Sequence, residues 1–284
     1  MQKKFGMVIV NYNDYPMTSR LVHNVENYSC LDLIVVVDNA SSDDSFSKLK
    51  KMANDRIAVI QNHSRQYSSG LNFGAQYLME KIGACCILFS NSDIIVKKEE
   101  DMKTLFQDVK DDVVVVGPVV DEHGVLNRGW RLPSTFQEIL FNIPFFSRYF
   151  KRKYLLYDEK VYEGDTSFVE VVSGCFFLVD SQFLKNCGFF DEGTFLYYEE
   201  QIFAEIVKRK KKKEMIDNRV VIIHDHSVTV DKSLKRIQKH KVLKKSQRYY
   251  LKKYKNANFI QMFLLYITDY FYRFVLCIRS LVGR

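Results

Sequence analysis

Two residues that can bind a divalent cation follow apolar runs of the sequence. Asp93 comes after the run CCILFS in the triplet Asn91-Ser92-Asp93, and His224 ends the run VVIIH, followed by Asp225 and His226. Carboxylate oxygens and imidazole nitrogens bind Mg²⁺ or Mn²⁺, which leave coordination positions open for phosphate oxygens. These residues could therefore hold a metal ion against a diphosphate. The alternatives are a simple turn at Asp93 and a structural role for the histidine.

Glu199 and Glu200 form a second candidate site, because they open a predicted helix after the sequence GFFDEGTFLYY. The positive end of the helix dipole stabilises ionised carboxylates at this position. One of the two could act as a general base that takes a proton from an acceptor hydroxyl group. The alternative is that the pair serves only the electrostatics of the first helical turn.

Short apolar runs alternate with amphipathic stretches through the first half of the chain. We expect strands over 5–12, 31–39, 56–62, 84–93 and 112–120, and helices over 15–28, 45–54, 71–82 and 99–110. Near-continuous apolar strands are typical of a parallel sheet that helices cover on both faces. The pattern therefore predicts a doubly wound α/β domain.

Polar side chains follow these strands, at the edge of the sheet where such folds bind ligands. They are Asn11, Asn13, Asp38, Asn39, Asn62, Asn91 and Asp93. Asp38 could hydrogen-bond a base or ribose, with a turn or cap role as the alternative. The chain has no GxxxxGK[ST] phosphate loop and no GxGxxG turn, which argues against nucleoside triphosphatases and ordinary dinucleotide enzymes.

The second half of the chain is less regular. The pattern loosens over 124–166, which predicts a long loop across the sheet edge. Within it, Trp130 could stack on a ligand or pack in the loop, and Arg131 could meet an anionic group or be solvated. Strands within 168–180, a helix over 198–210 and a strand over 219–226 are expected to follow.

The charge is distributed unevenly along the chain. Residues 232–284 carry a net charge of +13, whereas residues 1–231 carry −5. The apolar stretch 259–282 is interrupted by Gln261, Thr268, Asp269, Arg273 and Arg279, and central charges are costly in a membrane span. We therefore expect a helix that lies in the interface of an anionic membrane. Packing on the body or on a second subunit, as a homodimer, is the alternative.

Composition narrows the class of protein. The chain has 284 residues, 47% of them hydrophobic, and six cysteines without CxxC spacing, which favours a globular protein of a reducing cytoplasm. No signal peptide is recognisable at the start. Nucleic acid would suit the basic tail, but no nucleic-acid-binding motif is present and the aromatic terminus does not fit that partner.

Several motifs together resemble the family 2 inverting glycosyltransferases, most closely a bacterial rhamnosyltransferase-like branch that builds surface polysaccharides. The resemblance spans about residues 5–230. Its motifs, in order, are VIVNYN, VVVDNASSDDS, QYSSGLNFG, FSNSD, GPVVDEHG with RLPS, VSGCFFLVD, GFFDEGTFLYYEE and VVIIHDH. The resemblance implies a GT-A fold, which is Rossmann-like with a mostly parallel central sheet flanked by helices, here extended by a C-terminal basic, amphipathic helical segment.

The resemblance also implies roles for individual residues. Asp93 and His224 would hold Mn²⁺ or Mg²⁺, and Glu200 would be the catalytic base, with Glu199 as the alternative. The acceptor would meet Trp130, Arg131 and His226. The residues matching the nucleotide-sugar site are Asn11, Asn13, Asp38, Asn39, Gly70, Asn72, Asn91 and Ser92.

The implied activity is transfer of a sugar from a dTDP-rhamnose or UDP-hexose type donor to a glycan, on a polyprenyl-diphosphate-linked acceptor at the cytoplasmic face of the membrane. Residues 1–231 would form the transferase domain, with a nucleotide-sugar half over 1–120 and an acceptor half over 121–231, and 232–284 would form a tail. Two departures from the family pattern, Glu200 in place of Asp and Ile202-Phe203 in place of Asp-Leu, motivate an alternative. That alternative is a catalytically weak glycosyltransferase-like subunit that binds a membrane or a partner.

Overall fold

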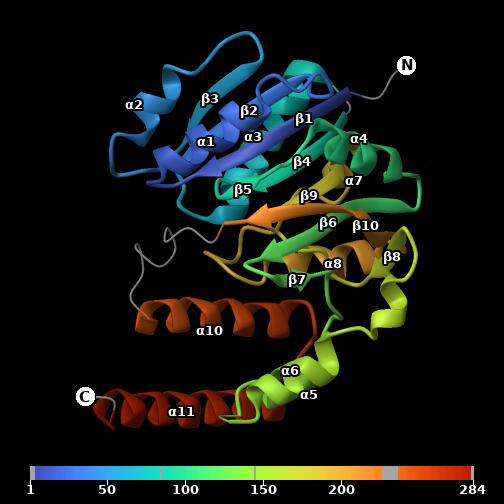
Figure 1. Cartoon of the computed structure of the whole chain (residues 1–284). Helices are drawn as coiled ribbons and strands as arrows, with labels where there is room; N and C mark the ends of the chain where they lie inside the picture. The colour runs from blue at the N-terminus through green and yellow to red at the C-terminus, as the bar shows by residue number, and fades with distance from the viewer. Residues whose placement is uncertain (1–3, 84, 144, 226–235, 283–284) are drawn as a thin grey trace.

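The protein is a mixed α/β structure with two long helices at its C-terminal end (Figure 1). The computed structural model describes residues 4–83, 85–143, 145–225 and 236–282. The elements of the first half are β1 (Lys4–Asn11), α1 (Tyr15–Val25), β2 (Leu33–Asn39), α2 (Ser45–Lys50), β3 (Ile57–Asn62), α3 (Tyr67–Ile82), β4 (Cys85–Asn91), β5 (Ile94–Ile95), α4 (Glu99–Asp108) and β6 (Val113–Glu122). The remaining elements are β7 (Val125–Asn127), α5 (Thr135–Leu140), α6 (Ser147–Leu155), the 3₁₀ helix η1 (Glu159–Tyr162), β8 (Thr166–Val169), β9 (Phe176–Asp180), α7 (Ser181–Asn186), α8 (Glu199–Arg209), β10 (Lys213–His224), α10 (Arg236–Lys253) and α11 (Phe259–Val282).

One sheet runs through the body, in the order β3-β2-β1-β4-β9-β6-β10-β5. The strands β3, β2, β1 and β4 are parallel neighbours, as the sequence predicts, and β6 is parallel to β10. Strand β9 joins the two groups because it is antiparallel to both β4 and β6. The carboxyl ends of the parallel strands therefore meet at one edge, where the polar side chains gather.

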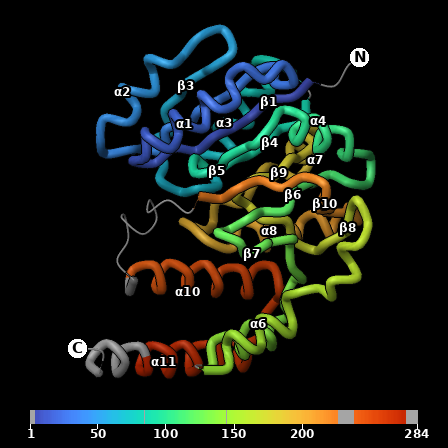
Figure 2. The backbone as a smooth tube through the Cα atoms, viewed as in Figure 1, coloured from blue at the N-terminus to red at the C-terminus, as the bar shows by residue number. Residues whose placement is uncertain are grey.

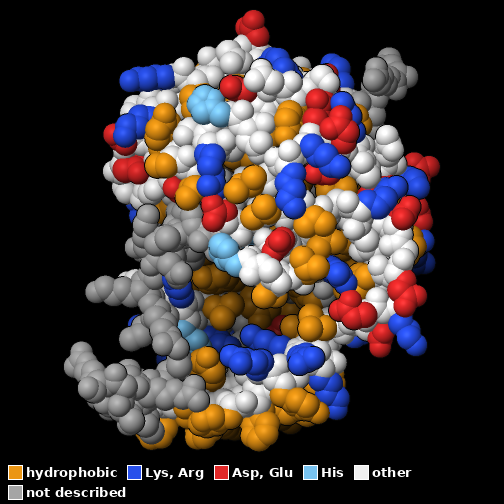
Figure 3. All heavy atoms as spheres, in the orientation of Figure 1, with side chains coloured by type: hydrophobic (Ala, Val, Ile, Leu, Met, Phe, Trp, Pro, Cys, Tyr) orange, Lys and Arg blue, Asp and Glu red, His pale blue; other side chains and the backbone are white. Residues whose placement is uncertain are grey.

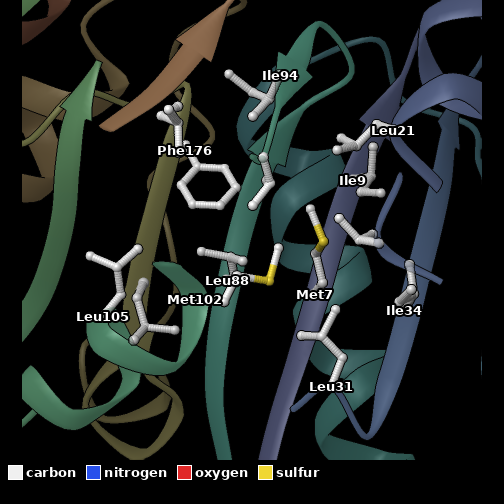
Figure 4. Packing of buried hydrophobic residues seen from close by; sticks show 14 of the residues in the cluster. Met7, Ile9, Leu21, Leu31, Ile34, Leu88, Ile94, Met102, Leu105 and Phe176 are labelled. Atoms are coloured by element: carbon white, nitrogen blue, oxygen red, sulfur yellow. The ribbon is translucent and has the colours of Figure 1, made fainter. Parts of the chain in front are cut away.

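Helices cover the sheet on both faces, and each face has its own apolar core. One core joins alternate residues of β1, such as Met7 and Ile9, to helices α1, α2 and α4, and Figure 4 shows part of it. The other joins Val8 and Val10 to helices α3, α7 and α8. The alternation along β1 is the period of two that a strand imposes, so an apolar run with both faces buried gives this layered arrangement.

The segment 124–166 differs from the long loop that the loosened pattern predicts. It contains β7, α5, α6 and η1. Helix α5 begins with a capping box, in which the Ser134 side chain accepts a hydrogen bond from the Gln137 backbone and the Gln137 side chain accepts one in return. This S-x-x-Q signal is legible in the sequence, whereas α6 is strongly polar and buries none of its residues.

The C-terminal helices are attached to the body through a third apolar cluster. Tyr250 and Leu251 of α10 are fully buried against Ile139 of α5 and Ile202 of α8. Polar contacts reinforce the attachment, since Asp191 accepts hydrogen bonds from Tyr249 and Lys253. Packing on the body, one of the two alternatives for the tail, is thus observed for α10. In Figure 2 helix α11 runs below α10 and beside α6.

No helix in the described ranges has both the length and the apolarity that crossing a bilayer requires.

Candidate active site

A pocket of about 840 Å³ opens at the carboxyl edge of the sheet and extends between the α/β body and the helices α5, α6 and α10. Figure 3 shows the molecule hollowed between the body and the C-terminal helices. The residues that line one part include Asn39, Asn91, Ser92, Asp93 and His224. Asn39, Asn91, Asp93 and His224 thus share one pocket with the two candidate catalytic bases, since Glu199 and Glu200 line it as well. The other predicted strand-end residues, Asn11, Asn13, Asp38 and Asn62, are not among the lining residues.

Asp93 and His224 are brought together by a short antiparallel pairing of β5 with the end of β10. Ile94 is the register partner of His224, and the backbone of Asp225 donates a hydrogen bond to the Asp93 carbonyl. As a result, Nε2 of His224 lies 3.2 Å from Oδ1 of Asp93. Nδ1 of the same ring lies 3.6 Å from Oε1 of Glu122, at the end of the neighbouring strand β6.

The charge on the His224 ring follows from these neighbours. Burial alone lowers the pKa of His224, but interactions with Asp93, Cys175 and Glu122 outweigh it and raise the pKa to about 12. A carboxylate on each side therefore stabilises a positive charge at the ring, and a bound cation would take the place of the proton on Nε2. Cys175 begins the turn into β9, and its thiol also lies 3.3 Å from the Ser173 hydroxyl.

The residues present fit a divalent cation. One carboxylate and one imidazole nitrogen face each other, and Glu122 is placed to orient the ring through its other nitrogen, as metal-binding histidines require. Mg²⁺ or Mn²⁺ bound by two protein ligands would keep positions for diphosphate oxygens and water. Within the described ranges no set of three side chains is arranged as a complete metal cage.

Glu199 and Glu200 occupy the first turn of α8, directly after Tyr198, which adopts a left-handed backbone conformation (φ 72°). Burial and the neighbouring Glu200 raise the pKa of Glu199 to about 8. Burial also raises the pKa of Glu200, although the backbone N–H groups of Glu200 and Gly174 offset part of this effect. A carboxyl group whose pKa is raised by burial is suited to exchange protons with a substrate.

A third carboxyl group, Glu214 at the start of β10, lies behind this pair. A cavity of about 20 Å³ is lined by Glu199, Glu200 and Glu214 together with apolar side chains. Oε2 of Glu214 accepts a hydrogen bond of 2.8 Å from the Val172 backbone, whereas Oε1 has no partner among the described residues. Burial, and to a smaller extent Glu200, raise the pKa of Glu214 to about 8.

Three of the predicted nucleotide-sugar residues, Asn11, Asn13 and Asp38, belong to a hydrogen-bonded network between the ends of β1 and β2, and none of the three is among the residues that line the pocket. Asn11 donates to the Asp38 carboxylate at 2.9 Å, and the backbone of Ser41 donates to the other carboxylate oxygen. The Asn13 backbone donates to the Ser41 hydroxyl, and the Asn13 side chain bonds Ser42. Asp38 exposes no surface in this arrangement. Its direct contact with a nucleoside stays a prediction that requires movement of the Ser41–Ser42 turn.

Gly70 and Asn72 have positions inside helix α3 that explain their residue types structurally. A Cβ atom at Gly70 would lie 2.9 Å from Oδ1 of Asn39, so glycine lets the helix approach the strand ends. The Asn72 side chain bonds both the N–H and the carbonyl of Phe190, and it also donates to Glu192. Asn72 thereby holds the segment that leads to Glu199. Neither residue is among those that line the pocket.

The three predicted acceptor residues differ in their placement. Trp130 is half-buried and lines the pocket, where its backbone pairs with that of Val171. Arg131 packs its guanidinium over the Tyr157 ring at 4.3 Å and donates to the Leu156 carbonyl. Arg131 is not among the lining residues, so its observed role is structural. His226 lies outside the described residues.

The lining residues that the sequence analysis did not single out include Tyr67, Glu122, Glu138 and Lys244. Glu122 follows an apolar strand, so the strand-end pattern that selects Asp93 could also have found it. The Tyr67 hydroxyl donates to the Asn91 side chain at 2.7 Å. Tyr67, Glu138 and Lys244 lie on helices whose local sequence contains no signal of a pocket, because only tertiary packing brings them to it.

Comparisons with known proteins agree on the fold. The model of the family described as "Glycosyl transferase family 2" matches residues 7–177. A Pyrobaculum calidifontis mannosyltransferase in complex with GDP-Man and Mn²⁺ is similar in structure, with a TM-score of 0.60 and 13% identity over 95% of this chain and 70% of that one. S. aureus TarS 1–349 in complex with UDP-GlcNAc has a TM-score of 0.52 and 15% identity over 90% and 75% of the two chains.

GalNAc-T7 with UDP, GalNAc and Mn²⁺ is also similar, with a TM-score of 0.58 and 16% identity over 78% of this chain. The match spans only 44% of the length of GalNAc-T7. No curated protein matches the sequence significantly.

The buried carboxyl of Glu214 predicts a pH-dependent stability. In the unfolded chain a glutamate has a pKa near ~4.3, so between about pH 4 and pH 8 the unfolded chain releases a proton that the folded protein retains. Stability should therefore fall with rising pH through this range. The variant Glu214→Gln keeps a neutral acceptor for the Val172 backbone and should not lose stability in this way. Relative to the wild type, its free energy of unfolding should be at least about 1 kcal/mol more favourable at pH 8 than at pH 5.

Urea unfolding at pH 5, 6, 7, 8 and 9 measures this difference. Glu80→Gln, on the exposed side of α3, is the matched control and should show no such trend. A stability difference between Glu214→Gln and the wild type that is constant across the range would contradict the assignment.

Proposed function

Because the chain belongs to glycosyl transferase family 2, we propose that it transfers a sugar from a nucleoside-diphosphate-sugar to a hydroxyl group of a glycan acceptor. One observation carries the proposal. Asp93, His224, Glu199 and Glu200 all line a single pocket at the carboxyl edge of the sheet. Such a pocket can hold a charged leaving group, a sugar and a proton acceptor together.

Asp93 and His224 are the proposed metal ligands, with Glu122 orienting the imidazole. A bound Mn²⁺ or Mg²⁺ supplies Lewis-acid stabilisation of the diphosphate leaving group. The fit of these residues supports the proposal, as do solved structures of similar fold that contain Mn²⁺. The nucleotide part of the donor is assigned to the edge that includes Asn39, Asn91 and Ser92.

Glu200 is the proposed base, with Glu199 as its neighbour and alternative. The Glu200 carboxylate removes the proton of the acceptor hydroxyl, whose oxygen then bonds to the anomeric carbon as the bond to the diphosphate breaks. Attack from the face opposite the leaving group inverts the configuration of that carbon. The buried setting of the pair raises both pKa values, which favours proton transfer near neutral pH.

The donor is proposed to be of the dTDP-rhamnose or UDP-hexose type, and the acceptor a lipid-linked glycan of cell-surface polysaccharide synthesis. These finer assignments rest on the motif resemblance to the rhamnosyltransferase-like branch. Residues 1–231 would then form the transferase domain, with Trp130 on its acceptor side, and residues 232–284 would form the tail that completes the pocket.

The tail is also the proposed contact with the cytoplasmic face of a membrane. Helix α11 exposes Phe259 by 84% and Tyr270 by 69%, and several other large apolar side chains accompany them. They are Ile260, Phe263, Leu264, Tyr266, Ile267, Phe271 and Phe274. Figure 3 shows hydrophobic side chains along this edge of the molecule. The nearby helix α6 has four basic residues and no acidic one, so an anionic lipid surface complements the edge in both respects.

Metal-dependent donor cleavage is the first expected outcome. A panel of UDP-, dTDP- and GDP-sugars incubated with the protein and Mn²⁺ should release nucleoside diphosphate from one donor. Asp93→Ala should lower this release at least about 100-fold, because the negative charge on the leaving group would no longer be stabilised by a bound metal ion. Asp111→Ala, which removes an exposed carboxylate just before the start of β6, is the control. Neither release nor nucleotide binding by the wild type would favour the catalytically weak binding subunit instead.

The base assignment predicts unequal effects at neighbouring positions. With donor and acceptor identified, Glu200→Gln should lower kcat about 100- to 10,000-fold and leave the affinity for the nucleotide unchanged. Glu199→Gln, the matched neighbour, should have a smaller effect. Single-turnover kinetics and nucleotide titration measure both quantities. The reverse order would assign the base to Glu199, and two fully active variants would refute this mechanism.

Membrane contact predicts a lipid-dependent loss of binding. Phe259 and Phe263 stack with ring centroids 6.4 Å apart on the exposed face of α11, so replacing both with serine removes a compact apolar patch. Co-sedimentation with vesicles that contain anionic lipid should show at least about tenfold weaker binding, since each buried Phe contributes roughly 1.5–3 kcal/mol. Val125→Ser, equally exposed on β7, should bind normally. Unchanged vesicle binding with a loss of dimers would identify the face as a subunit interface.

A further inference from the structure

We propose that the part of the pocket between α5, α6 and α10 is a second anion site, which binds a phosphate or diphosphate group on the acceptor through Lys244 and Lys151. The inference rests on the proposed function and extends it, because it names where the charged end of the acceptor lies. The pocket is large enough for two substrates, since its volume of about 840 Å³ is near the top of the range of about 300–1,000 Å³ for ligand sites.

Lys244 is the central residue of this second site. It lines the pocket from α10 yet exposes only 8% of its surface. Its ammonium group donates to Oδ1 of Asn142 and, at 3.0 Å, to Oε1 of Gln247. Both acceptors are neutral amides, and no carboxylate lies within ion-pair distance of Lys244 among the described residues. A buried cation held only by neutral oxygens has a charge that an anionic ligand can balance.

The two nearest acidic groups are engaged elsewhere. Oε2 of Glu138 accepts hydrogen bonds from the Tyr198 hydroxyl and the Gln247 amide. Asp269 of α11 lies 2.8 Å from Nε2 of His240. Burial lowers the pKa of Lys244 to about 8, an effect that Asp269 and Glu138 only partly oppose. Neither carboxylate is a direct partner of the Lys244 ammonium group, which is therefore able to pair with an anionic ligand.

A second lysine lines the same space. Lys151 of α6 lines the pocket together with Lys244, and α6 has no acidic residue. His240 also lines it, but burial lowers the pKa of this histidine and its ring is paired with Asp269. Figure 3 shows Lys and Arg side chains gathered along the lower wall of the hollow, on the side where Figure 1 places α10. Helices α6 and α10, which are far apart in the sequence, thus each contribute a lysine to one cavity. Two lysines that line the same space can bind the oxygens of a phosphate group.

The acceptor suits this site better than the donor does. The donor diphosphate is assigned to Asp93 and His224, at the ends of the strands. The first turn of α8 connects the two regions, because Tyr198 bonds Glu138 beside Lys244 while the next residues are Glu199 and Glu200. An acceptor whose phosphate contacts Lys244 therefore extends its hydroxyl toward the proposed base. Tyr272 of α11 also lines the pocket, so an apolar lipid chain could continue from there to the exposed face of that helix.

Binding of a simple lipid diphosphate tests the proposal without a glycan acceptor. Calorimetric titration of the full chain with farnesyl diphosphate, in EDTA so that no metal contributes, should show binding that Lys244→Gln weakens at least about tenfold. Lys151→Gln, at an exposed position that should tolerate substitution, should weaken it several-fold. Lys252→Gln, on the same helix α10 but outside the pocket lining, is the matched control. Thermal unfolding checks that each variant folds.

Two further arms separate the sources of the phosphate. Titration with UDP or dTDP in Mn²⁺ should be unchanged within about twofold by Lys244→Gln. Nucleotide binding that falls as much as farnesyl diphosphate binding would overturn the proposal by placing Lys244 in the donor site. Farnesyl diphosphate binding that neither lysine variant alters would also overturn it.

The same arms keep this proposal distinct from the proposed function. Failure of the wild type to bind any nucleotide would count against the transferase activity alone. Lys244-dependent binding of farnesyl diphosphate in that case would still establish the anion site, and its absence would refute it.

Discussion

The pairing of β5 with the end of β10 is the constraint on which the site depends. Two residues of β5 are enough to turn the chain back after β4, so that Asp93 lies beside His224, which is 131 positions later in the sequence. The pairing also completes the sheet edge at which Glu122 meets the other side of the imidazole. Asp93 follows β4 and His224 ends β10, so this short antiparallel contact is what brings the two proposed metal ligands together.

Burial of acidic groups is the second feature that shapes the site. The packing around these groups offsets the free energy that their burial costs. Glu199, Glu200 and Glu214 converge near one small cavity, in which burial raises all three pKa values and Glu200 further raises those of Glu199 and Glu214. Asn72 holds the segment before α8, and Gly174 leaves room for the Glu200 side chain, because a Cβ atom there would lie 2.7 Å from its Cγ. The apolar cores, one on each face of the sheet, stabilise the fold and so offset the cost of burying these carboxyl groups.

Much of the fold was predictable, because the strands of the first half are apolar runs whose neighbours in space are close in sequence. The GT-A fold that the resemblance implies is confirmed by the likeness to the glycosyltransferase structures. The helices within 124–166 were missed, because α5 has only six residues and α6 is strongly polar and buries none of its residues. Strand-end reasoning brought Asn91, Asp93 and His224 to one pocket. The assignment of Gly70 and Asn72 to the nucleotide-sugar site came from the motif resemblance and stays a prediction, since a motif does not distinguish a residue that lines a pocket from one that supports its wall.

The basic tail illustrates a different limit of sequence reasoning. Its charge of +13 suggests a single anionic surface, but the structure divides the tail between two environments. Helix α10 buries Tyr250 and Leu251 against the body and presents Lys244 to the pocket, whereas α11 exposes its aromatic face. The contact between His240 and Asp269 joins the two helices, so the helix that lines the pocket is linked directly to the helix that exposes the aromatic face. An acceptor with a charged head and an apolar chain would match both environments at once, which a charge count alone cannot reveal.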